Sequence, residues 1–418
     1  MPTRSLITVL LLSAAAVSSH GDNWPRFRGE NGSGVSASVT FPVEATDTDF
    51  AWKIDLPAIG HGSPVIWGDT LFLLCGDEKT GTRIPMAMDV ATGETLWQHE
   101  VDAGKFKGHR FNSPASTTPA ADADAVYFSW ATASALTLAA YDHAGNSIWT
   151  TDLGPVVGGH GFGASPMVFG DLVVLNNDQE KENGFLVALD RKTGKVTWKT
   201  PRKSARISYS TPVVYPHPKT HEPLLVFTNW THGFTAIDPK NGKVIAEISP
   251  FNQEVNERAI SSPIVWNDLI IGTCGFTSNP KHCVAVRLTD SGKFEEVWRI
   301  EKSVPHIPSV ILVHDLLYLW DDAGLVTCVK PANGESLWRE RVDTEGQTFG
   351  SPVSDGTSIF SVDQNGTLHA IAAAPEFAQL GHTKLDDTCR STPAIADGKL
   401  FIRTQSKLFA IQGTPTKK

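Results

Sequence analysis

One short phrase recurs along this chain: a small residue, an acidic or basic residue, a glycine turn and a tryptophan. It reads AMDVATGETLW over residues 87–97, ALDRKTGKVTW over 188–198 and, in a weaker copy, CVKPANGESLW over 328–338. Glycine supplies the positive φ that a tight hairpin turn requires, and the flanking residues favour strands. A phrase that returns in phase is typical of a repeat architecture, in which one structural unit is copied along the chain.

Each unit opens with a Ser-Pro or Thr-Pro step that leads into a short run of β-forming residues. Turns of the Gly-Asp or Asn-Asp type separate successive runs, which predicts antiparallel hairpins. Each unit therefore holds four antiparallel strands, and an interval of 41–55 residues between openings is typical of propeller blades. The eight openings are Ser63-Pro64, Thr118-Pro119, Ser165-Pro166, Thr211-Pro212, Ser262-Pro263, Ser351-Pro352, Thr392-Pro393 and a degenerate Pro308-Ser309.

The last unit is one strand short, and residues 50–54 form a strand that precedes the first unit. We expect this N-terminal strand to complete the last blade, because closure of the ring removes an exposed sheet edge. The sequence thus predicts an all-β protein whose single domain, over residues 50–413, is an eight-bladed β-propeller of four-stranded antiparallel blades. Residues 22–49 are interpreted as a strap packed on the propeller, and residues 414–418 as a tail.

The tryptophan has a structural explanation, since a broad ring at one fixed blade position can wedge between neighbouring sheets. In two units Ala246 and Leu380 are expected to replace it. The six tryptophans predicted to act as wedges are Trp52, Trp97, Trp149, Trp198, Trp298 and Trp338.

The N-terminus has the pattern of a cleavable Sec-type signal peptide over residues 1–21. Arg4 precedes an apolar run over 6–17 that is too short to span a bilayer, and small residues follow it. No cysteine of the lipoprotein type lies near the cleavage region. We therefore expect an exported protein, periplasmic or extracellular, that does not span the membrane. The formal net charge of −9 does not favour nucleic acid as a partner.

The five cysteines lie apart from one another and form no C-x-x-C motif. This spacing disfavours zinc ribbons, thioredoxin chemistry and c-type haem attachment. Cys274 and Cys283 flank a predicted hairpin loop, so in an oxidising compartment they could form a disulfide. The sequence leaves open whether they do.

The repeated phrase resembles the tryptophan-docking repeat of the pyrroloquinoline-quinone (PQQ)-like eight-bladed propellers. That superfamily includes the quinoprotein alcohol dehydrogenases and BamB of the outer-membrane assembly machinery. The segment over residues 23–35, NWPRFRGENGSGV, is similar to the start of exported PQQ-like repeat proteins of planctomycete-type bacteria. A resemblance to the dehydrogenases would imply an adjacent cysteine pair, a calcium site and a catalytic aspartate. The chain has no adjacent cysteines and no clustered oxygen ligands, so we predict no catalytic residue, no metal site and no bound cofactor.

Histidines and arginines gather just before the opening strands, where they should surround the mouth of the central channel. Arginine suits carboxylate or phosphate, which predicts a funnel for a small anionic ligand or an acidic peptide. The alternative is that these residues pair with loop carboxylates and hold the mouth together. The candidate residues are His61, His109, Arg110, His160, Arg206, Arg258, His306 and Arg390.

The predicted function is therefore that of a non-catalytic module that binds or scaffolds protein or peptide segments in the cell envelope. Two alternatives stay open. The first is a PQQ-dependent oxidoreductase, and the second is a sensor that binds a small anion or a sugar in the funnel.

Overall fold

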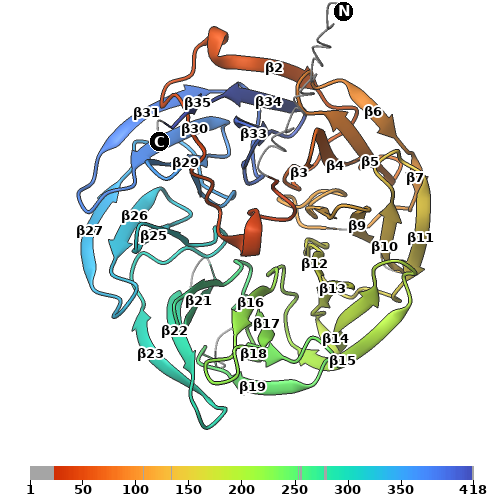
Figure 1. Ribbon diagram of the computed structural model, residues 1–418, viewed down its shortest axis with the longest axis vertical. Coiled ribbons are helices and arrows are strands. Elements are labelled where there is room, and N and C mark those ends of the chain that lie inside the picture. The colour runs from red at the N-terminus through yellow and green to blue at the C-terminus, as the bar shows by residue number, and fades with distance from the viewer. Residues whose placement is uncertain are drawn as a thin grey trace, which may run out of the picture.

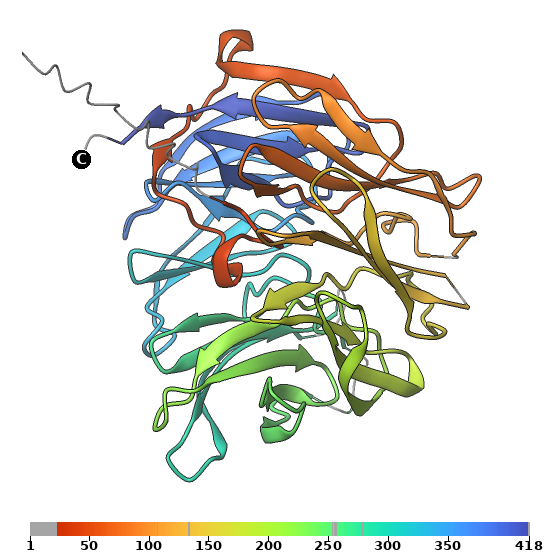
Figure 2. The ribbon, with the colours of Figure 1, turned by 45° about the vertical axis from the view of Figure 1, so that its right-hand side comes forward.

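The computed structural model describes residues 23–106, 108–132, 134–252, 254, 257–276 and 280–416. The predicted signal peptide, residues 1–21, lies outside these ranges. Eight antiparallel sheets radiate from a central axis, as Figure 1 shows in a view along that axis and Figure 2 in a view turned by 45°. The predicted eight-bladed propeller of four-stranded blades is confirmed.

The strands follow the chain from the axis outward within each blade. Blade 1 holds β3 (Val65–Trp67), β4 (Thr70–Gly76), β5 (Thr82–Asp89) and β6 (Thr95–Gln98), with β7 (Val101–Asp102) beside β5. Blade 2 holds β8 (Ala120–Ala121), β9 (Val126–Ala131), β10 (Leu136–Tyr141) and β11 (Ser147–Asp152). Blade 3 holds β12 (Met167–Phe169), β13 (Leu172–Asn177), β14 (Lys181–Asp190) and β15 (Val196–Ser204). Blade 4 holds β16 (Val213–Pro216), β17 (Pro223–Asn229), β18 (Gly233–Ile237) and β19 (Val244–Ile248).

The second half of the ring repeats this order. Blade 5 holds β20 (Ile264–Trp266), β21 (Leu269–Cys274), β22 (His282–Leu288) and β23 (Phe294–Ile300). Blade 6 holds β24 (Ile311–Val313), β25 (Leu316–Trp320), β26 (Leu325–Val329) and β27 (Ser336–Arg341). Blade 7 holds β28 (Val353–Ser354), β29 (Ser358–Val362), β30 (Thr367–Ala372) and β31 (Gln379–Lys384). Blade 8 holds β32 (Ala394–Ala396), β33 (Lys399–Arg403), β34 (Lys407–Gln412) and the N-terminal β2 (Phe50–Asp55).

The ring closes where the two ends of the propeller meet in blade 8. Strand β2 pairs antiparallel with β34, and Trp52 lies opposite Ala410. In Figure 1 the red β2 runs along the blue β34. The buried guanidinium of Arg403 on β33 donates to the carbonyls of Gly62 at 3.0 Å and Leu74 at 2.9 Å, which ties blade 8 to blade 1. The predicted closure by the N-terminal strand is therefore confirmed.

Each wedge tryptophan docks on a turn of the following blade. The Nε1 of Trp149 donates to the carbonyl of Arg191 at 2.9 Å, and its ring lies against Gly194 in the same turn. Trp52, Trp97, Trp198 and Trp298 pack in the same way on the next blade. The glycine of the repeated phrase therefore has two roles, since it adopts a positive φ and leaves room for the indole of its neighbour.

Gly194→Ala should destabilise the fold more than Gly170→Ala. Both glycines have positive φ, +68° and +56°, so alanine costs about 1 kcal/mol of backbone strain at either site. A Cβ at Gly194 would lie 2.6 Å from the Trp149 ring, whereas one at Gly170 meets no described atom within 4 Å. We expect this clash to cost about 2 kcal/mol more, measurable by denaturant unfolding. Equal losses in the two variants would contradict the wedge role of the tryptophan.

The substitute for tryptophan in blade 7 differs from the prediction. Ala370 lies opposite Gly381 in the register that elsewhere pairs an alanine with the wedge tryptophan, so the substitute is Gly381 and not Leu380, which is 39% exposed. A Cβ at Gly381 would lie 2.4 Å from the Cγ of Glu44. Residues of the N-terminal strap therefore occupy the space that an indole fills in other blades.

The Ser-Pro and Thr-Pro openings form a hydrogen-bonded collar around the axis. The backbone N–H of Ser63 donates to the hydroxyl of Thr118 at 2.9 Å, and that of Ser309 donates to Ser351 at 2.9 Å. Equivalent bonds join Thr118 to Ser165, Thr211 to Ser262, Ser262 to Ser309, Ser351 to Thr392 and Thr392 to Ser63. The degenerate opening keeps its hydroxyl in Ser309, so the hydroxyl is the part of the motif that links blade to blade.

The N-terminal strap covers one mouth of the channel. Its 3-10 turn η1 (Glu30–Gly32) lies at the centre of the ring in Figure 1. Trp24 exchanges backbone hydrogen bonds with Ile66 of blade 1, and Asn31 exchanges side-chain hydrogen bonds with Val214 of blade 4. Gly34 accepts a hydrogen bond from Ser354 N–H of blade 7. The strap thus reaches across the axis from one side of the ring to the other.

Beyond this crossing the strap continues as β1 (Val39–Thr40) and the 3-10 turn η2 (Asp47–Asp49) before it enters β2. Strand β1 pairs with β35 (Thr414–Pro415), so part of the segment interpreted as a tail adds to the structure.

The disulfide considered between Cys274 and Cys283 is not formed, and both are free thiols. Cys283 lies opposite Thr273, so the adjacent Cys274 points to the other face of the blade, and the two thiols belong to different core clusters. Within the ranges that the structure covers, no helix is both long and apolar enough to cross a bilayer.

Candidate functional site

The residue two positions before each collar hydroxyl points into one chamber on the propeller axis. An extended backbone sends alternate residues to the same side, so a residue at this spacing faces the axis together with the hydroxyl. The chamber has a volume of about 370 Å³. The eight residues at this position are His61, Ser116, Gly163, Tyr209, Ile260, Ile307, Phe349 and Arg390, and all of them line it.

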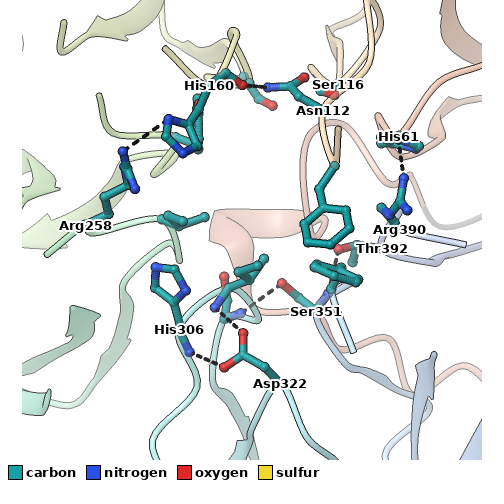
Figure 3. A pocket seen from close by; sticks show the side chains of 18 of the residues that line it. His61, Asn112, Ser116, His160, Arg258, His306, Asp322, Ser351, Arg390 and Thr392 are labelled. Carbon is teal, nitrogen blue, oxygen red and sulfur yellow. Dashed lines mark hydrogen bonds between the residues drawn. The ribbon is translucent and has the colours of Figure 1, made fainter. Parts of the chain in front are cut away.

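The strap gives the chamber a floor. Phe27, which lies between the buried Arg26 and Arg28, is the strap residue that lines it. In Figure 3 the faint red ribbon of the strap lies behind the side chains. Arg26 anchors this floor to the blades, because its Nη2 donates to the carbonyl of Pro212 at 2.8 Å. The chamber is therefore open toward the face that carries the loops preceding each blade.

Arg390 provides a cation on one side of the chamber. Its guanidinium carbon lies 5.0 Å from the ring centroid of Phe111 and 5.6 Å from that of Phe349, and its Nη1 donates to Nε2 of His61 at 3.4 Å. Among the described residues no carboxylate pairs with it. Burial first, and then the charge of Arg110, lower its pKa. An unpaired guanidinium beside two aromatic rings is suited to a carboxylate ligand.

Arg258 provides a second cation across the chamber from Arg390 (Figure 3). Its Nη2 donates to Nδ1 of His160 at 3.2 Å, and the ring of His160 stacks on that of His109 at 5.1 Å. The carboxylate of Glu180 lies 3.6 Å from Arg258 and 3.6 Å from Arg206. Arg258 therefore already has a carboxylate partner, although two arginines share a single carboxylate.

A third polar group surrounds Asp322. The backbone N–H groups of His306 and Ile307 donate to its two oxygens at 2.8 and 3.0 Å, and Nζ of Lys281 donates to it at 2.9 Å. This carboxylate thus holds the loop before blade 6 in place and already accepts three hydrogen bonds. Its negative charge is paired with the positive charge of Lys281.

The pKa values of three chamber histidines lie below the usual value. Burial, followed by the charges of Arg403 and Arg390, lowers the pKa of His61 to about 3. Burial lowers the pKa of His306 to about 4, and burial together with Arg258 lowers that of His160. These imidazoles are therefore neutral at pH 7, and the uncompensated positive charge of the chamber comes from its arginines.

Six of the eight predicted funnel residues line the chamber, namely His61, His109, His160, Arg258, His306 and Arg390. Arg206 does not line the chamber and pairs with Glu180, and Arg110 lines a neighbouring pocket. The alternative interpretation was that these residues pair with loop carboxylates and hold the mouth together. It applies to Arg206, which pairs with Glu180, and in part to Arg258, which pairs with the same carboxylate. The sequence interpretation missed the aromatic and polar lining, including Phe27, Phe111, Tyr209, Phe276, Lys281 and Asp322.

The chamber does not fit a quinone held beside a calcium ion. Calcium requires six to eight oxygen ligands, several of them carboxylates. The described lining offers a single carboxylate, Asp322, and that group is engaged by a lysine and two backbone donors. No group of three or more histidine, cysteine or acidic residues suited to a metal ion occurs among the residues described. The donor set favours an anionic guest over a metal.

Residues 84–340 and 322–413 match a protein family described as outer membrane protein assembly factor BamB. Among solved structures, BamB from Moraxella catarrhalis is similar with a TM-score of 0.61 and 14% identity, over 87% of this chain and 99% of that one. A quinohemoprotein alcohol dehydrogenase from Pseudomonas putida has a TM-score of 0.55 and 12% identity, over 95% and 81% of the two chains. A europium-containing methanol dehydrogenase has a TM-score of 0.53 and 11% identity, over 94% and 98%. No curated protein sequence matches the chain.

Proposed function

We propose a non-catalytic recognition function for this chain, which belongs to the family described as outer membrane protein assembly factor BamB. In this proposal the axial chamber holds an acidic segment of a partner protein. The observation that carries it is Arg390, a half-buried guanidinium that lines the chamber between two aromatic rings and lacks a carboxylate partner among the described residues. A buried cation without a counter-ion gains free energy when an anion binds beside it.

The rest of the molecule holds this chamber in a fixed shape, as a scaffold would. The strap and the closed ring fix the chamber wall, and a rigid site loses little conformational entropy on binding. We place the protein in the cell envelope, on the basis of the signal-peptide pattern over residues 1–21 and the family to which it belongs. Its partner there is a protein segment with exposed carboxylates.

Titration calorimetry with hexaglutamate at low ionic strength tests the proposal. We expect saturable binding by the purified protein, and binding at least about tenfold weaker for Arg390→Gln, because a charge-assisted hydrogen bond is lost. Arg258→Gln should weaken binding less, since Glu180 already neutralises part of that charge.

Arg287→Gln is the matched control, because Arg287 is a half-buried arginine on β22 that pairs with Asp268 and Glu295 and does not line the chamber. It should bind as the unmodified protein does, and far-ultraviolet circular dichroism should show that all variants fold. Absence of saturable hexaglutamate binding, or equal affinity in Arg390→Gln, would refute an acidic-segment site in the chamber.

A further inference from the structure

The axial chamber adjoins a second cavity on the same face. This side pocket has a volume of about 320 Å³ and lies between blades 1 and 2. His109 and Asn112 line both cavities. The two shared residues belong to the long segment between β7 and β8, which therefore forms a partition between the cavities.

The side pocket differs from the chamber in chemistry. Phe106, Trp130 and Phe162 supply apolar surface. Its charged residues have both signs, with Asp77 and Glu78 on the β4–β5 hairpin, Arg83 on β5, and Lys105 and Arg110 on the partition segment. Mixed charge and aromatic surface suit a peptide, whose amide groups and varied side chains need both polar and apolar contacts.

The chamber beside it is closed at one mouth. The strap crosses the axis and places Phe27 at the end of the chamber, so a polypeptide cannot thread through the ring. A chain that enters from the open face must present an end or a side chain. Arg258 and Arg390 repel the ammonium of an N-terminus and attract the carboxylate of a C-terminus.

We propose that the two cavities form one site for the C-terminal end of a partner polypeptide. The terminal carboxylate lies at Arg390 in the chamber, and the preceding residues cross His109 and Asn112 into the side pocket. This inference rests on the proposed function and deepens it, because it assigns a direction and an extent to the bound segment. Recognition of a free carboxylate does not require acidic side chains in the partner.

Calorimetry with three synthetic peptides tests the inference. The probes are a nine-residue peptide without charged side chains and with a free C-terminus, the same peptide with a C-terminal amide, and its last three residues alone. We expect the nine-residue acid to bind, the amide to bind at least about tenfold more weakly, and the three-residue acid to bind about tenfold more weakly.

Phe106→Ala separates the side pocket from the chamber. It should weaken binding of the nine-residue acid by about tenfold and leave the three-residue acid unchanged, because only the longer peptide reaches the side pocket. Phe377→Ala is the matched control, since Phe377 is also half-buried but packs on Trp338 of blade 6, remote from both cavities. It should bind both peptides as the unmodified protein does.

Two results would overturn the inference. Equal affinity for the amide and the acid would remove the role of the terminal carboxylate, and equal affinity for the two peptide lengths would remove the role of the side pocket. If hexaglutamate binds and the uncharged nine-residue acid does not, the chamber recognises acidic side chains, so the inference fails while the proposed function stands. If neither binds, the proposed function fails as well.

Discussion

Trp52→Ala should lower the free energy of unfolding by about 4 kcal/mol, as is usual when a buried aromatic side chain is truncated. Trp52 lies on β2, the strand that closes the ring, and it docks on blade 1 with its Nε1 3.1 Å from the carbonyl of Val90. The substitution removes this hydrogen bond and opens a cavity beside Gly93. It therefore weakens the packing of β2 against the blade that follows it. Denaturant unfolding followed by tryptophan fluorescence measures the loss.

Trp67→Ala is the control for the removal of one indole. Trp67 lies at the end of β3, is half-buried and has no hydrogen bond from its Nε1 among the described residues, so we expect a loss of about 1 kcal/mol. Trp52→Phe should lie between the two variants, because it keeps part of the apolar area and loses the donor. Similar losses for Trp52→Ala and Trp67→Ala would show that ring closure does not depend on the wedge.

The fold could be predicted from the sequence because each repeated residue type acts locally, within its own blade or on the next one. The glycine of the phrase turns the chain, the tryptophan fills the gap to the next blade, and the opening hydroxyl bonds to its neighbour. In blade 7 the predicted substitute for the tryptophan, Leu380, was wrong. A one-residue shift in register exchanges Leu380 with Gly381, and nothing local in the sequence reveals that Glu44 of the strap fills the vacant space.

The site could be predicted only in part. The candidate residues were selected by their charge, whereas their spacing from the collar hydroxyls is the better predictor of which residues line the chamber. His61 and Arg390 both stand two residues before a collar hydroxyl, and both line the chamber. Arg206 stands five residues before Thr211 and lies outside it, whereas Tyr209 at the correct spacing lines it. The alternation of side chains along an extended strand identifies the eight lining residues that stand two positions before a collar hydroxyl. Residues such as Phe27 and Asp322 reach the chamber only through the strap and a blade 6 loop, which no local pattern predicts.

The stability of the fold should fall as the pH drops from about 6.5 toward about 4, because two chamber histidines stay neutral when folded. The pKa of His61 is about 3 and that of His306 about 4 in the folded protein, against a usual value of 6.5. In this interval the unfolded chain binds protons that the folded chain does not bind. Each histidine then costs up to about 1.4 kcal/mol per pH unit, so together they remove roughly 3–5 kcal/mol by pH 4.5.

Variants that cannot be protonated isolate this effect from the titration of carboxylates. His306→Gln should flatten the dependence of unfolding free energy on pH between about 6.5 and 4.5, by about 2 kcal/mol relative to the unmodified protein. His382→Gln is the control for the loss of a histidine outside the chamber, because His382 is exposed on β31. The cause is physical: burial disfavours protonated His306, and the nearby charge of Asp322 offsets this only in part because Lys281 and Arg258 act against protonation. If the unfolding free energies of His306→Gln and of the unmodified protein depend on pH in the same way, the chamber accepts a protonated imidazole. The positive charge of the chamber would then come from histidine as well as from arginine.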